Sequence, residues 1–435
     1  MRIYVKKVEP GLAVSNAKVE ETVRGMLSEI RDRGDEAVRK YARNLDQWDR
    51  EFRVSEDEIR QASAQLPETF KDDFDICKRQ IQEFAKRQLD SLAEIEVEIS
   101  PGVVLGHKHI PVEKVGCYIP GGKYPLVSAA IMSVGTARVA GVAHIVGCAP
   151  PRDESGIYGP TLYGLSAAGA DEIYCIGGVQ AMAAMAYGRV GMAPADMITG
   201  PGNVFVAEAK RQLFGTVGID LMAGPTEILV IADETADPSL VATDLLGQAE
   251  HGPDSPAWLV TTSQEFGAAV LKEVERQLEN LPTRNIAAVS WHDRGEIIVV
   301  EDDDEAIEVS DEYAPEHLEL MTARDDYYLE NLRNYGSLFI GEETTVAYGD
   351  KGVGTNHTLP TGKAARYTGG LWVGKFIKTV TYQRMTPKAS HDFAPVVSRQ
   401  CEIEKLLAHQ ITADVRRERY ANTDRGKADV RRVQI

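Results

Sequence analysis

Short β-branched runs alternate with helical stretches through most of the chain, and this alternation constrains the fold more than any other feature. From residue 111 onward the runs are separated by Gly/Pro turns, and the intervening segments, such as 126–140 and 180–191, have helical spacing. Alternation of this kind predicts βαβ units, a largely parallel sheet and an α/β fold. The runs expected as buried strands are residues 115–118, 145–148, 173–176, 197–199, 228–231, 259–262, 297–300 and 337–340.

The two ends of the chain differ from this middle part. Residues 19–43 and 56–92 repeat apolar positions at helical spacing, so the first hundred residues are expected to be mostly helical. The tail beyond residue 390 is charged, and 402–417 is expected as the core of a helix that packs as an appendage or on a partner subunit. A chain of 435 residues is too long for one typical core, and a second α/β stretch follows residue 228, so two sheet-based domains are expected.

Composition excludes several classes of function. The net charge of −18 disfavours nucleic acid and anionic lipid as partners. The sequence has no apolar run of about 18 residues, which argues against a membrane span, and the N-terminus does not resemble a signal peptide. The 5 cysteines are widely spaced without a C-x-x-C, which is typical of reduced thiols in a cytoplasmic protein. We therefore expect a cytoplasmic protein with a small-molecule ligand and a local basic pocket for any anion.

Two Gly-rich turns, residues 118–125 and 199–203, each follow an expected strand and precede an expected helix. Small residues at such a turn let a phosphate approach backbone N–H groups. The G-x-G-x-x-G fingerprint is missing, however, so from the residues alone glycine as a turn former is favoured over dinucleotide binding.

Polar side chains that could carry chemistry are scattered through the second half. Gln248 and His251 lie three apart in an expected helix, 238–251, where they could converge on one ion or form a surface or capping pair. Glu316 and His317 follow Pro315, which suits the first turn of a helix. That pair could provide a base and a water activator, or Glu316 could simply decorate a helix N-terminus.

Two further pairs are weaker. Asp350 and His357 bracket a Gly-rich loop, where they suit zinc or substrate contact, or an Asx turn and a solvent histidine. Glu404 and His409 lie five apart in the expected tail helix, about 140° around it, and so could not both face one atom. At this level the residues support an α/β metalloenzyme.

Taken together, these segments resemble the histidinol dehydrogenase family. The resemblance runs over nearly the whole chain through the ordered motifs YIPGGKYPL, GPGNVFVAEAK, AGPTEILVIAD, LLGQAEHGPDS, YAPEHLEL and GDKGVGTNHTLPTG. It implies two incomplete Rossmann-like domains in an intertwined homodimer with shared active sites. The implied boundaries are an N-terminal segment 1–16, a first domain 17–117 with 228–370, a second domain 118–227, and a helical tail 371–435 that contributes to the partner subunit.

The resemblance also implies roles for single residues. The zinc ligands would be Gln248, His251, Asp350 and the partner subunit's His409, and the catalytic pair would be His317 as base and Glu316 as activator of water. Substrate contacts would be His357 and Glu404. NAD contacts would be Tyr118, Gln180 and Asn203, since this family binds NAD without the usual glycine fingerprint. The implied reaction is a four-electron oxidation of a primary alcohol to a carboxylate, with NAD⁺ as acceptor and zinc polarising the alcohol oxygen.

Some positions depart from the pattern of histidinol oxidation. Lys123, Tyr124 and Thr226 stand where small residues or serine are usual in that family, and Trp372 and Lys375 also depart from it. A lysine and a phenol in the site suit an anionic substrate. These departures resemble the branch that oxidises 2,3-dihydroxypropane-1-sulfonate to sulfolactate, with Lys123 and Arg366 as anion partners. Lys123 could instead face NAD phosphate or solvent, and Glu404 fits an amine better. True histidinol oxidation is the alternative, and a silent metal- or nucleotide-binding homologue is the remote one.

Overall fold

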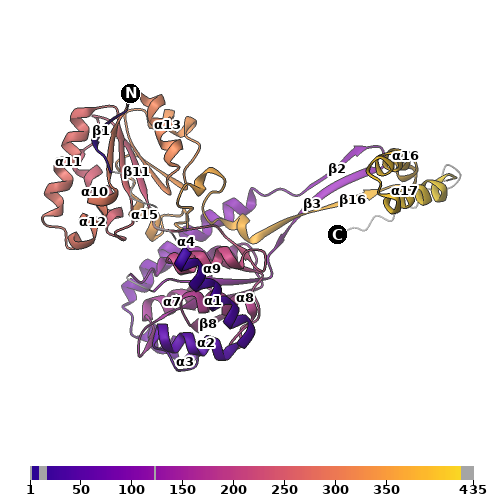
Figure 1. Cartoon of the computed structure of the whole chain (residues 1–435), viewed down its shortest axis with the longest axis horizontal. Helices are drawn as coiled ribbons and strands as arrows, with labels where there is room; N and C mark the ends of the chain where they lie inside the picture. Colours follow the sequence, from indigo (N-terminus) through magenta and orange to yellow (C-terminus); the bar gives the residue numbers. More distant parts are fainter. Residues whose placement is uncertain (1, 9–16, 122–123, 423–435) are drawn as a thin grey trace. The chain divides into compact units, whose positions relative to one another are not determined.

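The computed structural model describes residues 2–8, 17–121 and 124–422. By their contacts the residues divide into two units. The larger unit comprises Met1–Leu89 with Pro111–Phe376, and the smaller unit comprises Asp90–Ile110 with Ile377–Ile435. The larger unit contains two separate sheets, each covered by helices (Figure 1).

The first sheet of the larger unit has the strand order β1-β13-β12-β11-β14-β15. All neighbours are parallel except β1, which is antiparallel to β13. Along β11, Ile228 and Val230 pack in the core with the helices on one face, whereas Leu229 and Ile231 pack in the core on the other. The strands are β1 (Ile3–Lys6), β11 (Ile228–Ala232), β12 (Ala257–Thr261), β13 (Glu296–Val299), β14 (His317–Met321) and β15 (Ser337–Ile340).

Helices cover both faces of this sheet (Figure 1). One face carries α10 (Pro238–Ala249), α11 (Gln264–Leu278) and α12 (Arg284–Arg294). The other carries α13 (Asp303–Tyr313) and α14 (Asp325–Asn331). Because both faces are buried, β11 (Ile-Leu-Val-Ile-Ala) is a continuous apolar run, as expected of a parallel sheet.

The second sheet of the larger unit is entirely parallel, in the order β10-β9-β4-β5-β8. Its strands are β4 (Lys114–Tyr118), β5 (His144–Ala149), β8 (Glu172–Cys175), β9 (Met197–Thr199) and β10 (Gly218–Ile219). The helices packed with it include α1 (Ala17–Arg33), α3 (Glu56–Ala64), α7 (Gly159–Ala168), α8 (Gly178–Tyr187) and α9 (Val204–Leu213).

This packing differs from the boundaries expected above, which grouped residues 17–117 with the first sheet. The apolar stripe of α1 instead contacts α8 and α9, and β4 is the central strand of the second sheet. The remaining elements of the unit are α2 (Asp35–Tyr41), η1 (Ala42–Asp46), α4 (Glu68–Asp90), α5 (Ser128–Ala130), η2 (Ile131–Gly135), α6 (Thr136–Val139), β6 (Pro151–Asp153), β7 (Gly156–Ile157), α15 (Val346–Lys351), η3 (Ala364–Arg366) and η4 (Val373–Phe376).

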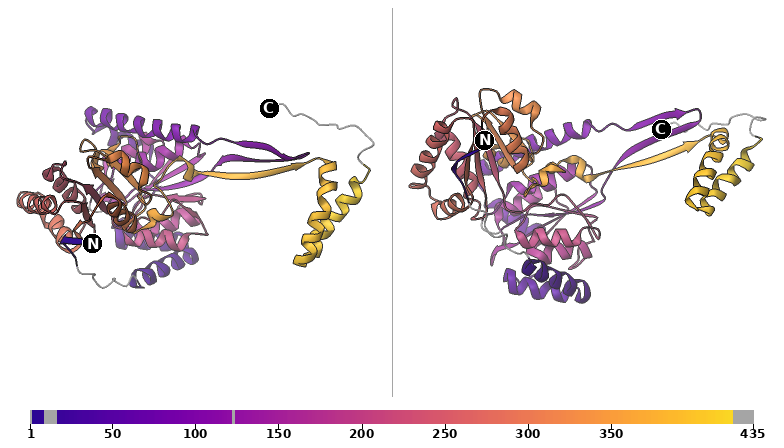
Figure 2. Two further views of the ribbon diagram at one scale, coloured as in Figure 1. Left: turned by 90° about the horizontal axis from the view of Figure 1, so that it is seen from above. Right: turned by 45° about the horizontal axis from the view of Figure 1, so that its top comes forward.

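The smaller unit combines a three-stranded sheet with a helical hairpin (Figure 2). The sheet has the order β16-β3-β2, from β2 (Ile95–Ser100), β3 (Val103–Pro111) and β16 (Ile377–Met385). The hairpin pairs α16 (Pro387–Glu404) with α17 (Leu407–Tyr420). These strands were not predicted, since helical tails were expected here. None of the helices in the described part of the chain is long and apolar enough to cross a membrane.

All the strands predicted from the apolar runs are present, and the α/β class is confirmed as mixed sheets. Two local predictions were wrong. His317 begins strand β14 instead of lying in a helix, because it pairs with Ile228 of β11 and the residues after it fill the core. The tail helix is broken at Lys405, whose φ of 62° is left-handed, so Glu404 and His409 belong to different helices.

Candidate active site

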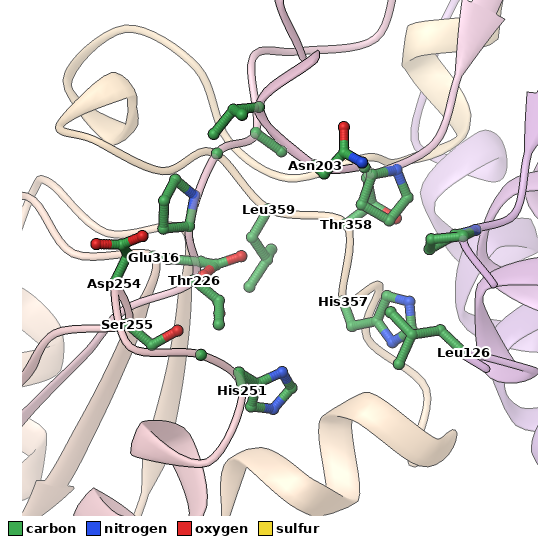
Figure 3. Close-up of a pocket in the computed structure, with 18 of the residues that line it drawn as sticks. Leu126, Asn203, Thr226, His251, Asp254, Ser255, Glu316, His357, Thr358 and Leu359 are labelled. Carbon is green, nitrogen blue, oxygen red and sulfur yellow. Dashed lines mark hydrogen bonds between the residues drawn. The ribbon is translucent and has the colours of Figure 1, made fainter. Parts of the chain in front are cut away.

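A cavity of about 370 Å³ lies in the larger unit, between the ends of strands from both sheets (Figure 3). Thr226, Ser255 and Glu316 precede β11, β12 and β14, so they stand at the amino ends of three parallel strands. Pro120 and Pro201 follow β4 and β9, at the carboxyl ends of the other sheet. The polar lining residues are Asn203, Thr226, His251, Asp254, Ser255, Glu316, His317, Asp350, His357 and Thr358.

Glu316 is held at the wall of this cavity by residues that precede β11. Its Oε2 accepts a hydrogen bond from the Thr226 hydroxyl and another from the backbone N–H of Glu227, at 3.0 Å. The side chain is almost fully buried, and burial raises the pKa of Glu316 well above its usual value. Burial therefore makes this carboxyl hold a proton more readily than an exposed glutamate does.

His317 is a neutral base. Its Nδ1 lies 2.9 Å from the backbone carbonyl of Glu227, and since a carbonyl can only accept, Nδ1 carries the proton. Burial lowers the pKa of His317 to about 4, although Asp350 acts in the opposite direction. The other nitrogen, Nε2, is buried and has no hydrogen-bond partner among the described residues. A ring nitrogen with a free electron pair in a cavity can accept a proton from a bound alcohol.

Three of the four residues predicted to bind zinc come from two short segments of the larger unit. Helix α10 ends at Ala249, and His251 follows in a turn in which its N–H bonds the Gln248 carbonyl at 3.2 Å. Gln248 does not line the cavity but donates from Nε2 to the Thr226 hydroxyl, at 2.5 Å. Asp350 lies in α15 and not in the loop that was expected to hold it. Both His251 and Asp350 line the cavity.

His357 projects into the same cavity as His251 (Figure 3). Its Nδ1 lies 2.9 Å from the Asp350 carbonyl, so Nε2 is unprotonated and, among the described residues, without a partner. Burial lowers the pKa of His357, which keeps the ring neutral. A backbone carbonyl on one nitrogen is the usual way in which proteins orient an imidazole whose other nitrogen binds a ligand.

The donor set fits a zinc ion in its chemistry but does not enclose one. Imidazole nitrogens and a carboxylate are preferred zinc ligands. In residues 2–8, 17–121 and 124–422, no group of three or more His, Cys, Asp or Glu side chains is arranged to hold a metal. Glu404 and His409 are exposed and belong to the smaller unit, so the structure does not place them at this cavity.

The predicted NAD contacts line a second cavity, of about 600 Å³. Tyr118, Gln180 and Asn203 all belong to it, and Asn203, His251, Pro120 and Leu126 line both cavities, which makes the two adjacent. The Gln180 amide donates to Asp46 at 2.9 Å, whereas its buried Oε1 has no partner in the described part of the chain. A buried acceptor that is unpaired in the protein suits a bound ligand that donates to it.

The predicted substrate contacts do not all gather around Glu316 and His317. Thr226 and His357 line the cavity, but Tyr124 lines only the second one, where its hydroxyl donates to the Glu250 carbonyl at 3.3 Å. Lys123 lies outside the described residues. Arg366 donates to the Glu312 carbonyl and Lys375 to Thr368, each at 2.7 Å. Neither cation lines the cavity, and no other lysine or arginine of the described residues does.

Sequence reasoning missed Glu227 and Asp46. The carbonyl of Glu227 sets the tautomer of His317, its N–H binds Glu316, and burial raises the pKa of its own carboxyl to about 7. Asp46 accepts from Gln180 and from the N–H of Gly177, and burial raises its pKa too. Backbone groups carry no signature in a sequence, and Asp46 is far from Gln180 along the chain, so no local spacing could reveal either contact.

Known proteins resemble this chain over nearly its full length. A sequence profile described as histidinol dehydrogenase matches residues 12–417. A protein named sulfopropanediol 3-dehydrogenase from Ruegeria pomeroyi is 45% identical over 96% of this chain and 96% of its own length. A "histidinol dehydrogenase homolog" from Shouchella clausii is 53% identical, over 97% and 100% respectively. A histidinol dehydrogenase from Methanothermobacter thermautotrophicus is 42% identical, over 89% and 91%.

The fold agrees with these sequence matches. The crystal structure of histidinol dehydrogenase from Elizabethkingia anophelis superimposes with a TM-score of 0.88 at 35% sequence identity, and the match covers 96% of this chain and 95% of that chain.

Proposed function

The chain belongs to the histidinol dehydrogenase family, and we propose that it oxidises a primary alcohol to a carboxylate with NAD⁺ at the cavity that holds Glu316 and His317. The observation that carries this proposal is the buried, neutral Nε2 of His317, which has no hydrogen-bond partner among the described residues. The overall reaction consumes the alcohol, two NAD⁺ and one water, and yields the carboxylate, two NADH and three protons.

His317 is the base of the first half-reaction. Its Nε2 accepts the hydroxyl proton of the alcohol while the carbon that bears this hydroxyl transfers a hydride to NAD⁺, which gives an aldehyde. The lowered pKa keeps Nε2 unprotonated at neutral pH, and the Glu227 carbonyl keeps the ring oriented. The reaction therefore does not depend on prior deprotonation of the base.

Glu316 acts in the second half-reaction. Water adds to the aldehyde, and a second hydride transfer to NAD⁺ then gives the carboxylate. We assign the orientation and activation of this water to Glu316, whose Oε2 is anchored by Thr226 and by the N–H of Glu227. Glu316 and His317 are adjacent in the chain, with Nδ1 and Oε2 3.5 Å apart, so both steps occur without movement of the substrate between sites.

The residues that would hold zinc are Gln248, His251, Asp350 and the partner subunit's His409. When bound, zinc supplies Lewis-acid polarisation of the alcohol oxygen. A homodimer is part of this proposal because His409 belongs to the smaller unit. In support, Leu407, Ile411 and Val415 form an exposed apolar stripe at i, i+4 spacing along α17, and such a stripe is typical of a helix that is covered in an assembly.

The NAD site is the second cavity. Tyr118, Gln180 and Asn203 line it, and the unpaired Oε1 of Gln180 is suited to accept a hydrogen bond from the cofactor. Asn203 caps α9 by accepting from the N–H groups of Phe205 and Val206. Because the two cavities adjoin at His251 and Asn203, a cofactor in one can meet an alcohol in the other.

For the substrate we propose 2,3-dihydroxypropane-1-sulfonate, which would be oxidised to sulfolactate. Similarity to a sulfopropanediol 3-dehydrogenase supports this choice, and Lys123 is assigned to the sulfonate. L-histidinol is the second candidate. The described lining has the carboxyl groups of Asp254, Glu316 and Asp350 and no lysine or arginine, which suits a substrate with an ammonium group.

The test is NADH formation with the two alcohols side by side, counted per alcohol consumed. Two NADH per sulfopropanediol and none with L-histidinol would support the proposal. Strong turnover of L-histidinol would make L-histidinol the substrate and leave the proposed reaction unchanged. No NADH from either alcohol, with zinc and NAD⁺ present, would favour a silent binding homologue. His317→Ala is the matched control, since it should retain zinc and lose NADH formation.

A further inference from the structure

Asp244 of α10 and Glu319 of β14 form a pair of carboxyl groups that the proposed reaction does not use. Glu319 is fully buried on β14, which lies between β11 and the edge strand β15 of the six-stranded sheet. Its carboxyl lies within hydrogen-bonding distance of that of Asp244. Its Oε2 has no hydrogen-bond donor among the described residues. Two carboxylates cannot stay ionised side by side without a cation, so one proton must lie between them.

The pair connects α10 and β14 to the start of α15. Glu319 Oε1 accepts from the N–H of Val346 at 2.9 Å, and Asp244 Oδ1 accepts from the Thr345 hydroxyl at 3.0 Å. Thr345 and Val346 begin α15, so both carboxyl groups grip the first turn of that helix. The pair therefore ties α15 to α10 and to β14.

Each of these elements also carries a residue of the proposed site, within a few residues of the pair along the chain. Gln248 lies four residues after Asp244 on α10, one helical turn away. Asp350 lies four residues after Val346 on α15. His317 lies two residues before Glu319 and on the same side of β14. Displacement of α15 at its first turn would thus move Asp350 relative to Gln248 and His317.

We propose that Asp244 and Glu319 share one proton and act as a positioning pair that sets Asp350 and Gln248 in place relative to His317. The part of this inference that concerns zinc rests on the proposed function. The shared proton does not, because it follows from the burial and the contacts of the two carboxyl groups.

The shared proton is tested by the pH dependence of unfolding of the metal-free protein. Burial raises the pKa of both carboxyl groups, and among the described residues Asp244 is the one charged group that acts on Glu319. A carboxyl whose pKa is raised in the folded state keeps a proton that the unfolded chain releases, so stability falls as pH rises. The urea midpoint of the wild type should therefore fall more steeply between pH 5 and 9 than that of Glu319→Gln or Asp244→Asn. Equal slopes would refute the shared proton.

The positioning role is tested by zinc affinity, measured by competition with a chromogenic chelator. Glu319→Ala leaves the N–H of Val346 without its acceptor and should weaken zinc binding about tenfold or more, as loss of outer-shell partners does. Glu319→Gln can still accept from Val346 and donate to Asp244, so it should bind zinc like the wild type.

Val270→Ala is the control for destabilisation alone, because Val270 is buried in the same core but lies on α11, which carries no site residue. It should retain zinc affinity. Wild-type affinity in Glu319→Ala, or equal loss in the Gln and Ala variants, would refute the positioning role. A wild type that binds no zinc would refute the zinc assignment and the positioning role together, whereas the unfolding slopes would still decide the shared proton.

Discussion

The neutral state of His317 predicts a pH-dependent loss of stability that a single substitution should remove. Burial lowers the pKa of this side chain from its ordinary 6.5 to about 4 in the folded protein. Between these values the unfolded chain binds a proton that the folded protein excludes. The stabilising contribution is therefore complete above pH 6.5 and is lost as pH falls toward 4.

The size of the effect follows from the two pKa values. Each unit of pKa difference corresponds to about 1.4 kcal/mol, so a shift from 6.5 to about 4 contributes about 3 kcal/mol over the whole window. Most of the loss falls in an accessible range, since the His317 contribution should be about 2 kcal/mol smaller at pH 5 than at pH 7.

The assay is urea unfolding of the metal-free protein at a series of pH values between 5 and 7.5. His317→Asn removes the titrating ring and keeps an N–H that can donate to the Glu227 carbonyl. Its free energy of unfolding should fall less between pH 7 and pH 5 than that of the wild type, by about 2 kcal/mol. His292→Asn, at an exposed position, controls for the loss of one imidazole from the unfolded chain. Parallel curves for His317→Asn and the wild type would show that His317 is not a buried neutral base.

Three further predictions concern Thr226, Asp46 and Lys123. Thr226→Val removes the hydroxyl that joins Gln248 to Glu316 and should lower the free energy of unfolding by about 2 kcal/mol, whereas Thr226→Ser should cost about 1 kcal/mol or less, both measured in urea. Asp46→Ala releases the Gln180 amide and should raise the KM for NAD⁺ about tenfold with little change in kcat, which equals about 1.4 kcal/mol of binding; an unchanged KM would separate Gln180 from the cofactor. Lys123→Ala should raise the KM for the sulfonate about tenfold or more and leave any turnover of L-histidinol unchanged, because loss of a charge-assisted contact weakens binding of the anionic substrate only. Equal kinetics in the variant and the wild type would show that Lys123 does not bind the substrate.

The strands of this fold were predictable because most of them are buried on both faces. Residues 228–232, Ile-Leu-Val-Ile-Ala, form an unbroken apolar run that only an internal strand of a parallel sheet requires. Strand β14 lies in the same sheet and is as deeply buried, but its sequence is His-Leu-Glu-Leu-Met. The polar residues interrupt the apolar run, and the strand was taken for the start of a helix.

The smaller unit was missed for a different reason. Strand β2 is Ile-Glu-Val-Glu-Ile-Ser, and its residues are exposed on both faces. Strand β16 is similarly exposed over most of its length. The alternation in β2 is a strand signal, but nothing along the chain shows that β3 and β16 complete its sheet, since β16 lies more than 250 residues further on.

The site shows most clearly what a sequence withholds. His317 and His357 each bond a backbone carbonyl through Nδ1, that of Glu227 in one case and that of Asp350 in the other. In both rings this contact fixes the tautomer and leaves Nε2 buried with an unshared electron pair. Any residue could supply such a carbonyl, so the identity of residues 227 and 350 does not reveal it. Residue types could therefore nominate both histidines, but only the fold explains why each can act as a base or ligand at neutral pH.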